Sequence, residues 1–567
     1  MAYIIADNII SPLGNTTADN LKAVLAGQSA LTRHKAVELG VGDDFVSSLL
    51  PKMADNGQEG LHFEQKVLAS VSAALTDSGV EVESVRTLLV LSTTKGNIEQ
   101  LAPEKSDNDI AIGHTARRIA RKLGFVTDPI VVCNACISGL EALILGQRLI
   151  DQGQYDNVIV CGTDDIGRFV VSGFQSLKAL SADECRPFDI ERTGLNLGEA
   201  VATAVLSNRT TQNCWQLADG VVRNDAYHIS APSKQADGQY LCLKQLLAHI
   251  QVSDIDFINL HGTATLFNDQ MESVALKRAA LETVPANGYK GYYGHTLGAA
   301  GVLESVLSIH SANAHTVLGT RGLDELGVSG KVNVSAEKRT CQGSAFVKTL
   351  SGFGGCNAAA LFTHVSNGKA VTGNNIKPRR LESVCCIELT SDKLVINGKE
   401  QDVAGEHGDH LLVHLYKKHV ADYPKFYKMD PLSRLGFIAS ELLLKSECNI
   451  EDSSETSDRA IVFFNEHSSL AADRKYLNSI APPDAYYPSP SVFVYTLPNI
   501  VTGEIAIRHG YHGETSFYIL AERNRAQMLQ ILTSATADQG THSILAGWVD
   551  YCDEQHYVAD LAIYKII

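Results

Sequence analysis

The chain has 567 residues, a hydrophobic content of 45%, a charged content of 20% and a formal net charge of −16 at pH 7. This length and balance indicate a folded protein with a large core and more than one domain, and they exclude an intrinsically disordered chain. The negative charge argues against a general nucleic-acid-binding protein, because that function needs a basic surface.

The N-terminus, the apolar runs and the cysteines bear on location. The first residues, MAYIIADNIISPLGN, lack the basic region of a secretory signal. No apolar run approaches the roughly 20 residues of a membrane span, and the 12 cysteines are scattered along the chain. We therefore expect a cytoplasmic protein with reduced thiols and no membrane span.

Strands alternate with helices over the first 206 residues. The predicted strands are 3–10, 88–91, 130–133, 157–162 and 200–206, and predicted helices include 63–75, 115–123 and 140–150. This alternation predicts α/β layers around a mostly central sheet. The helix at 115–123 carries a basic cluster, Arg117, Arg118, Arg121 and Lys122. Its simplest interpretation is a solvated helix face, and a patch for an acidic partner is the alternative.

A second pass of the same kind follows. It has predicted strands at 255–260 and 358–362 and a helix at 297–309. Residues 366–380 then lose all periodicity and gather Gly, Asn, Lys and Pro, which predicts a linker. We place that linker at 366–382 and a further unit at 383–567.

Cys136 lies in a small-residue turn between a predicted strand and a helical pattern. A helix N-terminus offers free N–H groups and a positive dipole end, which favour a thiolate. A single cysteine after a buried strand is nevertheless more often an inert packing residue. Cys133 and Cys136 also form a C-x-x-C, but nothing else in the sequence resembles a thioredoxin unit, which argues against a redox pair.

Two histidines occupy similar positions in the second pass. His261 ends a predicted strand, and His295 precedes a predicted helix, each beside small residues. Open α/β sheets gather ligand-facing groups at such points. A cysteine with a histidine is a nucleophile and base, and a second histidine can donate to an oxyanion. Lone histidines are usually structural, so the surrounding motifs decide the interpretation.

Those motifs resemble the signature regions of β-ketoacyl-acyl carrier protein synthases. The similar stretches are Asn134–Gly139, the HGTAT turn at 261–265 with Asp269, the turn at 290–296, and Gly-Phe-Gly-Gly at 352–355. Ser-Pro-Leu-Gly at 11–14 and Arg-Pro-Phe-Asp at 186–189 also match, in the expected order. The resemblance covers about residues 1–365. It implies a thiolase-like α/β fold, a layered αβαβα arrangement of two similar halves at about 1–210 and 211–365.

The resemblance also implies a mechanism. Cys136 would take an acyl chain as a thioester, and His261 and His295 would contact the thioester carbonyl of malonyl-carrier protein. Lys290 would join Glu272 in a charge network that orients His295; a surface ion pair is the alternative. Asp269 would be a supporting residue.

The Gly-Phe-Gly-Gly turn would serve as an oxyanion loop and gate. The backbone N–H groups of Cys136 and Phe353 would hold the oxyanion, and Gly352 and Gly354 would let Phe353 move. A purely structural tight turn also fits these glycines. Cys356 departs from the family pattern, and a second cysteine there is reminiscent of thiolases.

By this resemblance the chain is an acyltransferase that needs acyl carrier protein, no metal and no cofactor beyond the carrier's phosphopantetheine. A homodimer or similar ketosynthase assembly is expected. The alternatives are a non-catalytic chain-length-factor-like partner or scaffold, and a thiolase-like coenzyme A acyltransferase. The acyl chain length, the carrier protein and the pathway (fatty acid, polyene or polyketide) stay open.

The unit at 383–567 resembles the first half of a second synthase. Residues 510–529 align without gaps on 124–143, and Glu522 then falls opposite Cys136. Residues 430–435 resemble an early ketosynthase helix, and 488–493 with 496–499 resemble the substrate-channel and dimer region. A carboxylate cannot form a thioester, so we expect this half to be inactive. It would reshape the assembly as a chain-length partner or merely bury surface.

Overall fold

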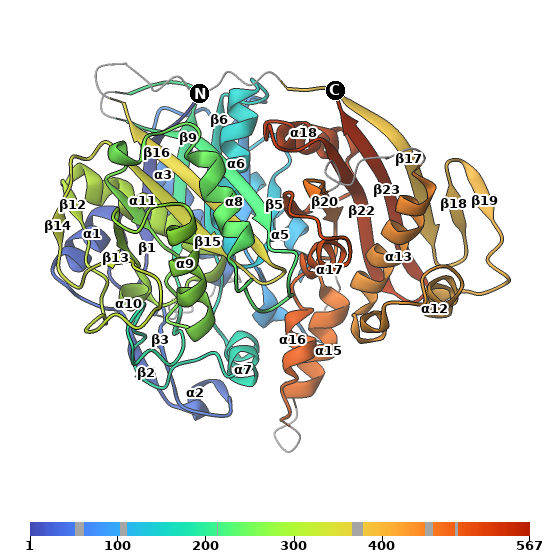
Figure 1. The fold of residues 1–567 in the computed structure, drawn as a ribbon, viewed down its shortest axis with the longest axis horizontal. Helices are drawn as coiled ribbons and strands as arrows, with labels where there is room; N and C mark the ends of the chain where they lie inside the picture. The colour runs from blue at the N-terminus through green and yellow to red at the C-terminus, as the bar shows by residue number, and fades with distance from the viewer. Residues whose placement is uncertain are drawn as a thin grey trace.

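The computed structural model describes residues 1–51, 62–76, 78–102, 110–211, 214–365, 378–447, 457–481 and 486–567. Most of the predicted linker, 366–377, lies outside these residues. Figure 1 shows the first two-thirds of the chain, blue to yellow, packed beside an orange and red C-terminal unit. Among the described residues, no helix combines the length and apolarity needed to cross a bilayer.

The first half is built on one five-stranded sheet. Its strands, in spatial order, are β1 (Ala2–Ile10), β8 (Val201–Ser207), β6 (Asn157–Thr163), β4 (Thr87–Ser92) and β5 (Ile130–Val132). The first two pairings are antiparallel and the last two are parallel. In chain order the strands therefore lie 1-5-4-2-3, with the third strand at the edge.

The second half repeats this order and these directions. Its strands are β9 (Trp215–Asn224), β16 (Cys356–His364), β15 (Ala345–Ser351), β10 (Phe257–Asn259) and β11 (Pro285–Asn287). The short β13 (Asn333–Val334) extends this sheet beyond β11. The expected pair of similar α/β halves is present.

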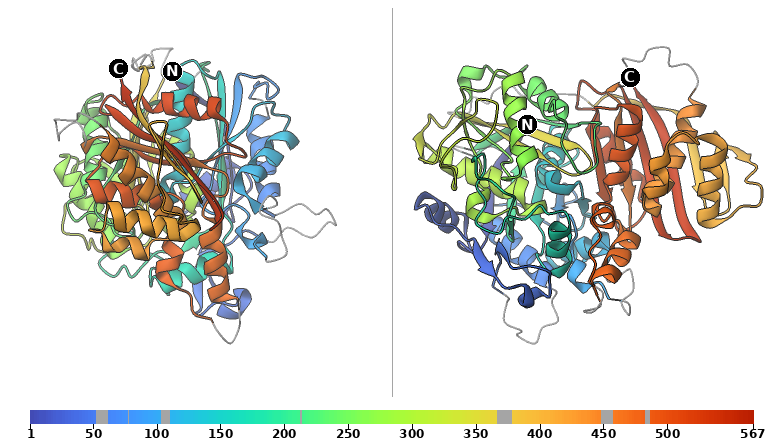
Figure 2. Two further views of the ribbon diagram at one scale, coloured as in Figure 1. Left: turned by 90° about the vertical axis from the view of Figure 1, so that its right-hand side faces the viewer. Right: turned by 60° about the horizontal axis from the view of Figure 1, so that its bottom comes forward.

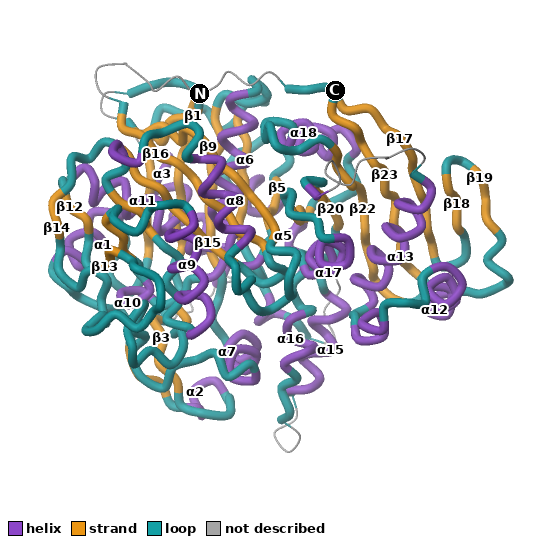
Figure 3. The backbone as a smooth tube through the Cα atoms, in the orientation of Figure 1, coloured by secondary structure: helices purple, strands orange, loops and turns teal. Residues whose placement is uncertain are grey.

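The C-terminal unit has the same strand order again. Its strands are β17 (Leu381–Thr390), β23 (His556–Ile566), β22 (Ser543–Asp553), β20 (Ala460–Asn465) and β21 (Thr515–Ile519). The edge strands β21 and β5 pair antiparallel, with Tyr518 opposite Val132, so the two sheets are continuous. The hairpin β18 (Leu394–Ile396) and β19 (Lys399–Gln401) lies at the far edge, as the tube in Figure 3 shows.

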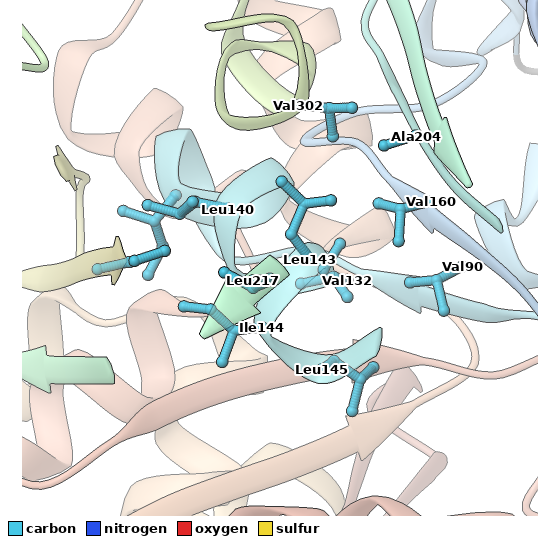
Figure 4. Close-up of a cluster of buried hydrophobic side chains, with 14 of the residues drawn as sticks. Val90, Val132, Leu140, Leu143, Ile144, Leu145, Val160, Ala204, Leu217 and Val302 are labelled. Atoms are coloured by element: carbon cyan, nitrogen blue, oxygen red, sulfur yellow. The ribbon is translucent and has the colours of Figure 1, made fainter. Parts of the chain in front are cut away.

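Two central helices, α6 (Ser138–Asp151) and α11 (Ala300–Asn313), lie between the two sheets of residues 1–365. They approach closely because of glycine: a Cβ on Gly301 would lie 2.0 Å from the Leu140 nitrogen. Figure 4 shows Leu140, Leu143, Ile144 and Leu145 of α6 among side chains of the surrounding strands. This core fixes the start of α6, which is where Cys136 lies.

Most of the remaining helices cover the outer faces of the sheets or join them, as two further views show (Figure 2), whereas α18 packs against α6. They are α1 (Thr17–Leu25), α2 (Ala36–Leu39), α3 (His62–Leu75), α5 (Ile112–Lys122), α7 (Arg168–Ser176), α8 (Asp237–Leu246), α9 (Leu266–Arg278), α10 (Lys290–Tyr293), α12 (Gly408–His419), α13 (Pro431–Ser446), α15 (Leu470–Ile480), α16 (Pro490–Val494), α17 (Ile500–His509) and α18 (Arg525–Ala535). There are two small additional sheets among the described residues. One has three strands, β2 (Thr32–His34), β3 (Phe45–Ser48) and β7 (Leu197–Gly198), and the other has two, β12 (Thr316–Val317) and β14 (Arg339–Thr340).

Buried ion pairs tie the C-terminal unit to the first half. Arg148 of α6 pairs with Glu514 at 2.7 Å, and Lys95 pairs with Asp473 at 2.7 Å. All four side chains are almost fully buried. Because removing one partner leaves an uncompensated buried charge, such pairs favour one fixed arrangement of the units.

Candidate active site

Cys136 lies in a short 3-10 turn, Ala135–Ile137, between β5 and α6. Ser138 closes the turn: its hydroxyl accepts from the Asn134 N–H at 2.8 Å and donates to the Ala135 carbonyl at 2.6 Å. Ala135 has a positive φ of 47°, which is uncommon for a residue with a Cβ. The packed strand and helix on either side hold this sharp turn and present the thiol at the start of α6.

Burial dominates the acidity of this thiol. It raises the pKa of Cys136 to about 12, although Lys290 and the N–H groups of Cys136 and Phe353 act in the opposite direction. The N–H groups at the helix start lower the pKa of this thiol, as expected, but burial raises it by more. The Cys136 thiol must therefore lose its proton when its sulfur attacks a substrate carbonyl.

The two histidines face Cys136. The Cys136 sulfur and one ring nitrogen of each of His261 and His295 all lie within 4.8 Å of one another. The imidazole rings are nearly perpendicular, with centroids 5.0 Å apart. His261 follows β10, and His295 follows α10 after Gly294, whose φ of 70° reverses the chain. The strands and turns of both halves thus bring the three predicted residues together.

Both histidines are neutral. Burial, followed by the nearby charge of Lys290, holds the pKa of each well below its ordinary value. The Leu297 N–H donates to His295 Nδ1 at 3.2 Å, so the proton of this neutral ring must be on Nε2. His295 Nε2 and His261 Nδ1 are buried without a hydrogen-bond partner among the described residues. An N–H at His295 Nε2 is therefore available to a substrate carbonyl.

The Gly-Phe-Gly-Gly turn packs directly against Cys136. A Cβ on Gly352 would lie 3.1 Å from the Cys136 nitrogen, so a larger residue would disturb the turn. The backbone N–H groups of Phe353 and Cys136 both form hydrogen bonds toward the Cys136 sulfur and lower its pKa. The predicted pair of oxyanion donors therefore points to one place, next to the nucleophile.

The predicted Lys290–Glu272 network is wrong. Lys290 pairs with Glu304, which lies on α11 and is itself buried. Glu272 on α9 instead accepts the N–H groups of His261 at 2.7 Å and Gly262 at 2.8 Å. The two carboxylates lie on different helices, so Glu272 fixes the His261 turn while Glu304 compensates the lysine.

Asp269 has a structural position beside that turn. Its carboxylate accepts the N–H of Phe188 at 2.7 Å and that of Ala264 at 3.2 Å. It therefore links the Arg-Pro-Phe-Asp loop to the HGTAT turn, which agrees with a supporting place.

The sequence interpretation missed two residues, Glu304 and Lys348. Lys348 on β15 is fully buried, pairs with the second oxygen of Glu304 and donates to the Leu260 carbonyl at 3.3 Å. Each is a lone charge in an apolar element, AGVLESVLSIH and AFVKTLS. Charged residues are rarely buried without a partner, so a single charge within an apolar helix or strand predicts a buried ion pair. That pattern could have identified both residues from the sequence.

The other two cysteines considered, Cys133 and Cys356, contact backbone carbonyls. Cys133 is buried and its sulfur contacts the Thr94 carbonyl at 3.5 Å, which gives no support to a redox pair with Cys136. Cys356 donates to the Phe353 carbonyl at 3.3 Å, and burial raises its pKa well above the usual value. The Cys356 thiol thus bonds the turn that carries Phe353.

A narrow, mostly apolar cavity leads away from the thiol. Its wall combines residues of the first two halves with three from the C-terminal unit: Thr94, Lys95, Ala135, Cys136, Val170, Phe174, Leu297 and Phe353, and then Phe493, Thr496 and Leu497. The stretch 496–499, which resembles a substrate-channel region, thus reaches the site from the third sheet. The cavity is only about 30 Å³, so it marks an apolar surface beside Cys136 and not an open channel.

Comparison with known proteins agrees with this geometry. Residues 51–212 match the family model "Beta-ketoacyl synthase, N-terminal domain", and residues 216–324 match "Beta-ketoacyl synthase, C-terminal domain". The chain contains both domains of a β-ketoacyl synthase. Over these ranges the chain is similar to the 3-oxoacyl-acyl carrier protein synthases, which are acyltransferases.

Relatives along the sequence support the same family. The chain is 27% identical over 410 residues to a putative mitochondrial 3-oxoacyl-acyl carrier protein synthase of Schizosaccharomyces pombe, covering 62% of this chain and 96% of the relative. It is 31% identical over 252 residues to 3-oxoacyl-acyl carrier protein synthase 2 of Rhizobium meliloti, covering 41% and 59%.

Solved structures confirm the thiolase-like fold. The ketosynthase ApeO with its chain length factor ApeC, from Xenorhabdus doucetiae, superposes with a TM-score of 0.56 at 24% identity, covering 64% of this chain and 98% of that one. The PfaC keto synthase-chain length factor superposes with a TM-score of 0.76 at 14% identity, covering 100% and 78%. The fold likeness to PfaC thus includes the C-terminal unit.

Proposed function

We propose that the protein catalyses the decarboxylative Claisen condensation of an acyl group with malonyl-acyl carrier protein. The observation that carries this proposal is the cluster of Cys136, His261 and His295 within 4.8 Å, with both rings neutral. Neutral rings can donate to a carbonyl, and a cysteine can hold the acyl chain. Acyl carrier protein is the proposed partner, since its phosphopantetheine thiol delivers both substrates.

In the first step the Cys136 sulfur attacks the thioester carbonyl of the acyl-carrier protein. The tetrahedral oxyanion is stabilised by the N–H groups of Cys136 and Phe353, which already face the sulfur. The carrier thiolate leaves and takes up the proton lost by Cys136. The acyl chain would then lie against the apolar side chains of Phe174 and Phe493, which must move to admit it because the cavity between them is only about 30 Å³.

In the second step malonyl-carrier protein places its thioester carbonyl between the two histidines. The donor at His295 Nε2, together with His261, stabilises the enolate that forms as carbon dioxide leaves. The enolate carbon attacks the Cys136 thioester, which forms the new carbon–carbon bond and releases the cysteine. The product is a 3-oxoacyl chain two carbons longer.

Labelling of the cysteine and mass spectrometry of the products test this proposal. The Cys136→Ala variant should take no acyl group from acyl-carrier protein, and the exposed Cys386→Ala variant should behave as wild type. Undiminished labelling of the first variant would refute the assignment. Release of carbon dioxide from malonyl-carrier protein separates a synthase from a coenzyme A acyltransferase. An inert wild-type protein would favour the scaffold alternative.

We also infer that residues 383–567 are an inactive half-synthase that serves as the partner of the first site. Its sheet has the strand order of the first half, and Glu522 stands where the alignment expects a nucleophile. Glu522 is 62% exposed and pairs with Arg117 at 3.0 Å. Three residues of this unit line the cavity, which favours a role in acyl-chain selection over simple burial of surface.

This arrangement bears on the expected assembly. The β5 edge, free in an isolated half, is already paired with β21 of the same chain. We therefore propose that the chain forms its ketosynthase-type interface internally. Any homodimer would use another surface.

A further inference from the structure

Two lysines share one buried carboxylate beside the histidine pair. Lys290 contacts one oxygen of Glu304, and Lys348 contacts the other at 2.5 Å. Neither lysine side chain is exposed, and Glu304 is nearly buried. Within this trio one carboxylate balances one of two cations, which leaves one excess positive charge while all three groups are ionised. Glu272, a further acid that acts on Lys348, instead accepts the N–H groups of His261 and Gly262.

The surroundings of Lys348 explain how that charge is held. Its ammonium also donates to the Leu260 carbonyl at 3.3 Å, at the end of β10 and one residue before His261. The titratable groups that act on it are Glu304, Lys290 and Glu272. In turn its charge lowers the pKa of both His261 and His295. A buried cation is costly, so its retention at this point calls for a reason.

We propose that Lys348 is a positioning residue that fixes the end of β10 at His261 and supplies a second positive charge for the enolate. The inference rests on the proposed function, since it concerns the same site. The hydrogen bond to Leu260 orients the turn that carries His261. The excess charge opposes protonation of both rings and stabilises negative charge that develops between them.

Titration of Lys348 should then appear in the reaction. Burial lowers the pKa of Lys348 to about 8, despite the attraction of Glu304. Below that pH the cluster keeps its excess charge, and above it the charge is lost. The wild-type rate of decarboxylation should therefore fall as the pH rises through about 8.

The decisive variant is Lys348→Met, which keeps the length of the side chain and removes its charge. Lys66→Met is the matched control, because Lys66 is also buried and paired, with Asp165 at 2.6 Å, outside the histidine cluster. We expect Lys348→Met to lower kcat for malonyl-carrier decarboxylation by about 10- to 100-fold with KM nearly unchanged, less than the loss of a direct oxyanion donor. Lys66→Met should keep the wild-type kcat.

The pH profile distinguishes this role from a merely structural one. Lys348→Met should lose the fall above pH 8, and its acid limb should move to higher pH because the histidine pKa values rise. A wild-type profile and rate in Lys348→Met would overturn the proposal.

A second readout does not depend on turnover. Nuclear magnetic resonance of 15N-labelled histidine, assigned with His261→Gln and His295→Gln, should show both ring pKa values raised in Lys348→Met. If wild type fails to decarboxylate the substrate, the proposed function falls, and the ring titration still decides this inference. Unchanged ring pKa values in the variant would refute it.

Discussion

Replacing Asn499 with alanine should slow the synthase although the residue belongs to the C-terminal unit. Asn499 lies at the start of α17 and is 1% exposed. Its Nδ2 donates to the Phe353 carbonyl at 2.8 Å, and a Cβ on Gly354 would lie 2.6 Å from the same nitrogen. The side chain therefore clamps the turn that carries the Phe353 oxyanion donor.

The size of the effect follows from what remains after truncation. The Phe353 carbonyl would keep only a weak thiol contact, from Cys356 at 3.3 Å. An unmet buried hydrogen bond costs about 1–3 kcal/mol. If that cost destabilises the conformation in which the Phe353 N–H faces Cys136, and only this conformation is active, kcat drops by about 5- to 150-fold. Because Asn499 does not touch the substrate carbonyl, KM should change little.

The assay is steady-state condensation with saturating acyl- and malonyl-carrier protein, paired with thermal unfolding. Asn465→Ala is the control, since Asn465 is also buried and bonds only within its own unit, to the Ser468 carbonyl at 2.8 Å. Both variants should lose stability, but only Asn499→Ala should lose kcat. Equal kcat in the two variants would show that the C-terminal unit does not act on the gate.

Two further predictions concern the C-terminal unit. Glu522→Ala should leave turnover unchanged and stability within about 1 kcal/mol, because its pair with Arg117 is surface-exposed; a large loss of rate would show that this unit takes part in the chemistry. Asp538→Asn should cost about 3–5 kcal/mol at pH 7 by breaking the buried pair with Arg223. Burial alone would raise the pKa of Asp538, but Arg223 outweighs it and holds that pKa well below its usual range. The stability that this pair contributes is present above the unfolded pKa of about 3.9 and is lost progressively as the pH falls below that value. Denaturant unfolding should therefore show that the difference in unfolding free energy between wild type and Asp538→Asn shrinks below pH 4. A difference that stays constant with pH would contradict the assignment.

The sequence predicted which residues meet at the candidate site better than it predicted the residues that support them. Cys136, His261 and His295 lie in small-residue turns whose types recur at fixed places in the fold, so motifs sufficed to find them. The partner of Lys290 could not be found this way, because Glu272 and Glu304 are both acids on helices of the second half. Only the packing of α11 beside α10 decides between them. Desolvation of Cys136 was likewise invisible, since burial depends on all three sheets.

The strand order also limits what the C-terminal unit can do. Both histidines come from the second half, after β10 and α10, while the nucleophile comes from the first. A complete site therefore needs two adjacent units of this topology, and residues 383–567 form one such unit. Its pairing through β21 instead brings Phe493 and Asn499 to the existing site. A repeated half placed in this way can change the cavity and the gate of its neighbour, and selection on it would act through those contacts rather than through a nucleophile of its own.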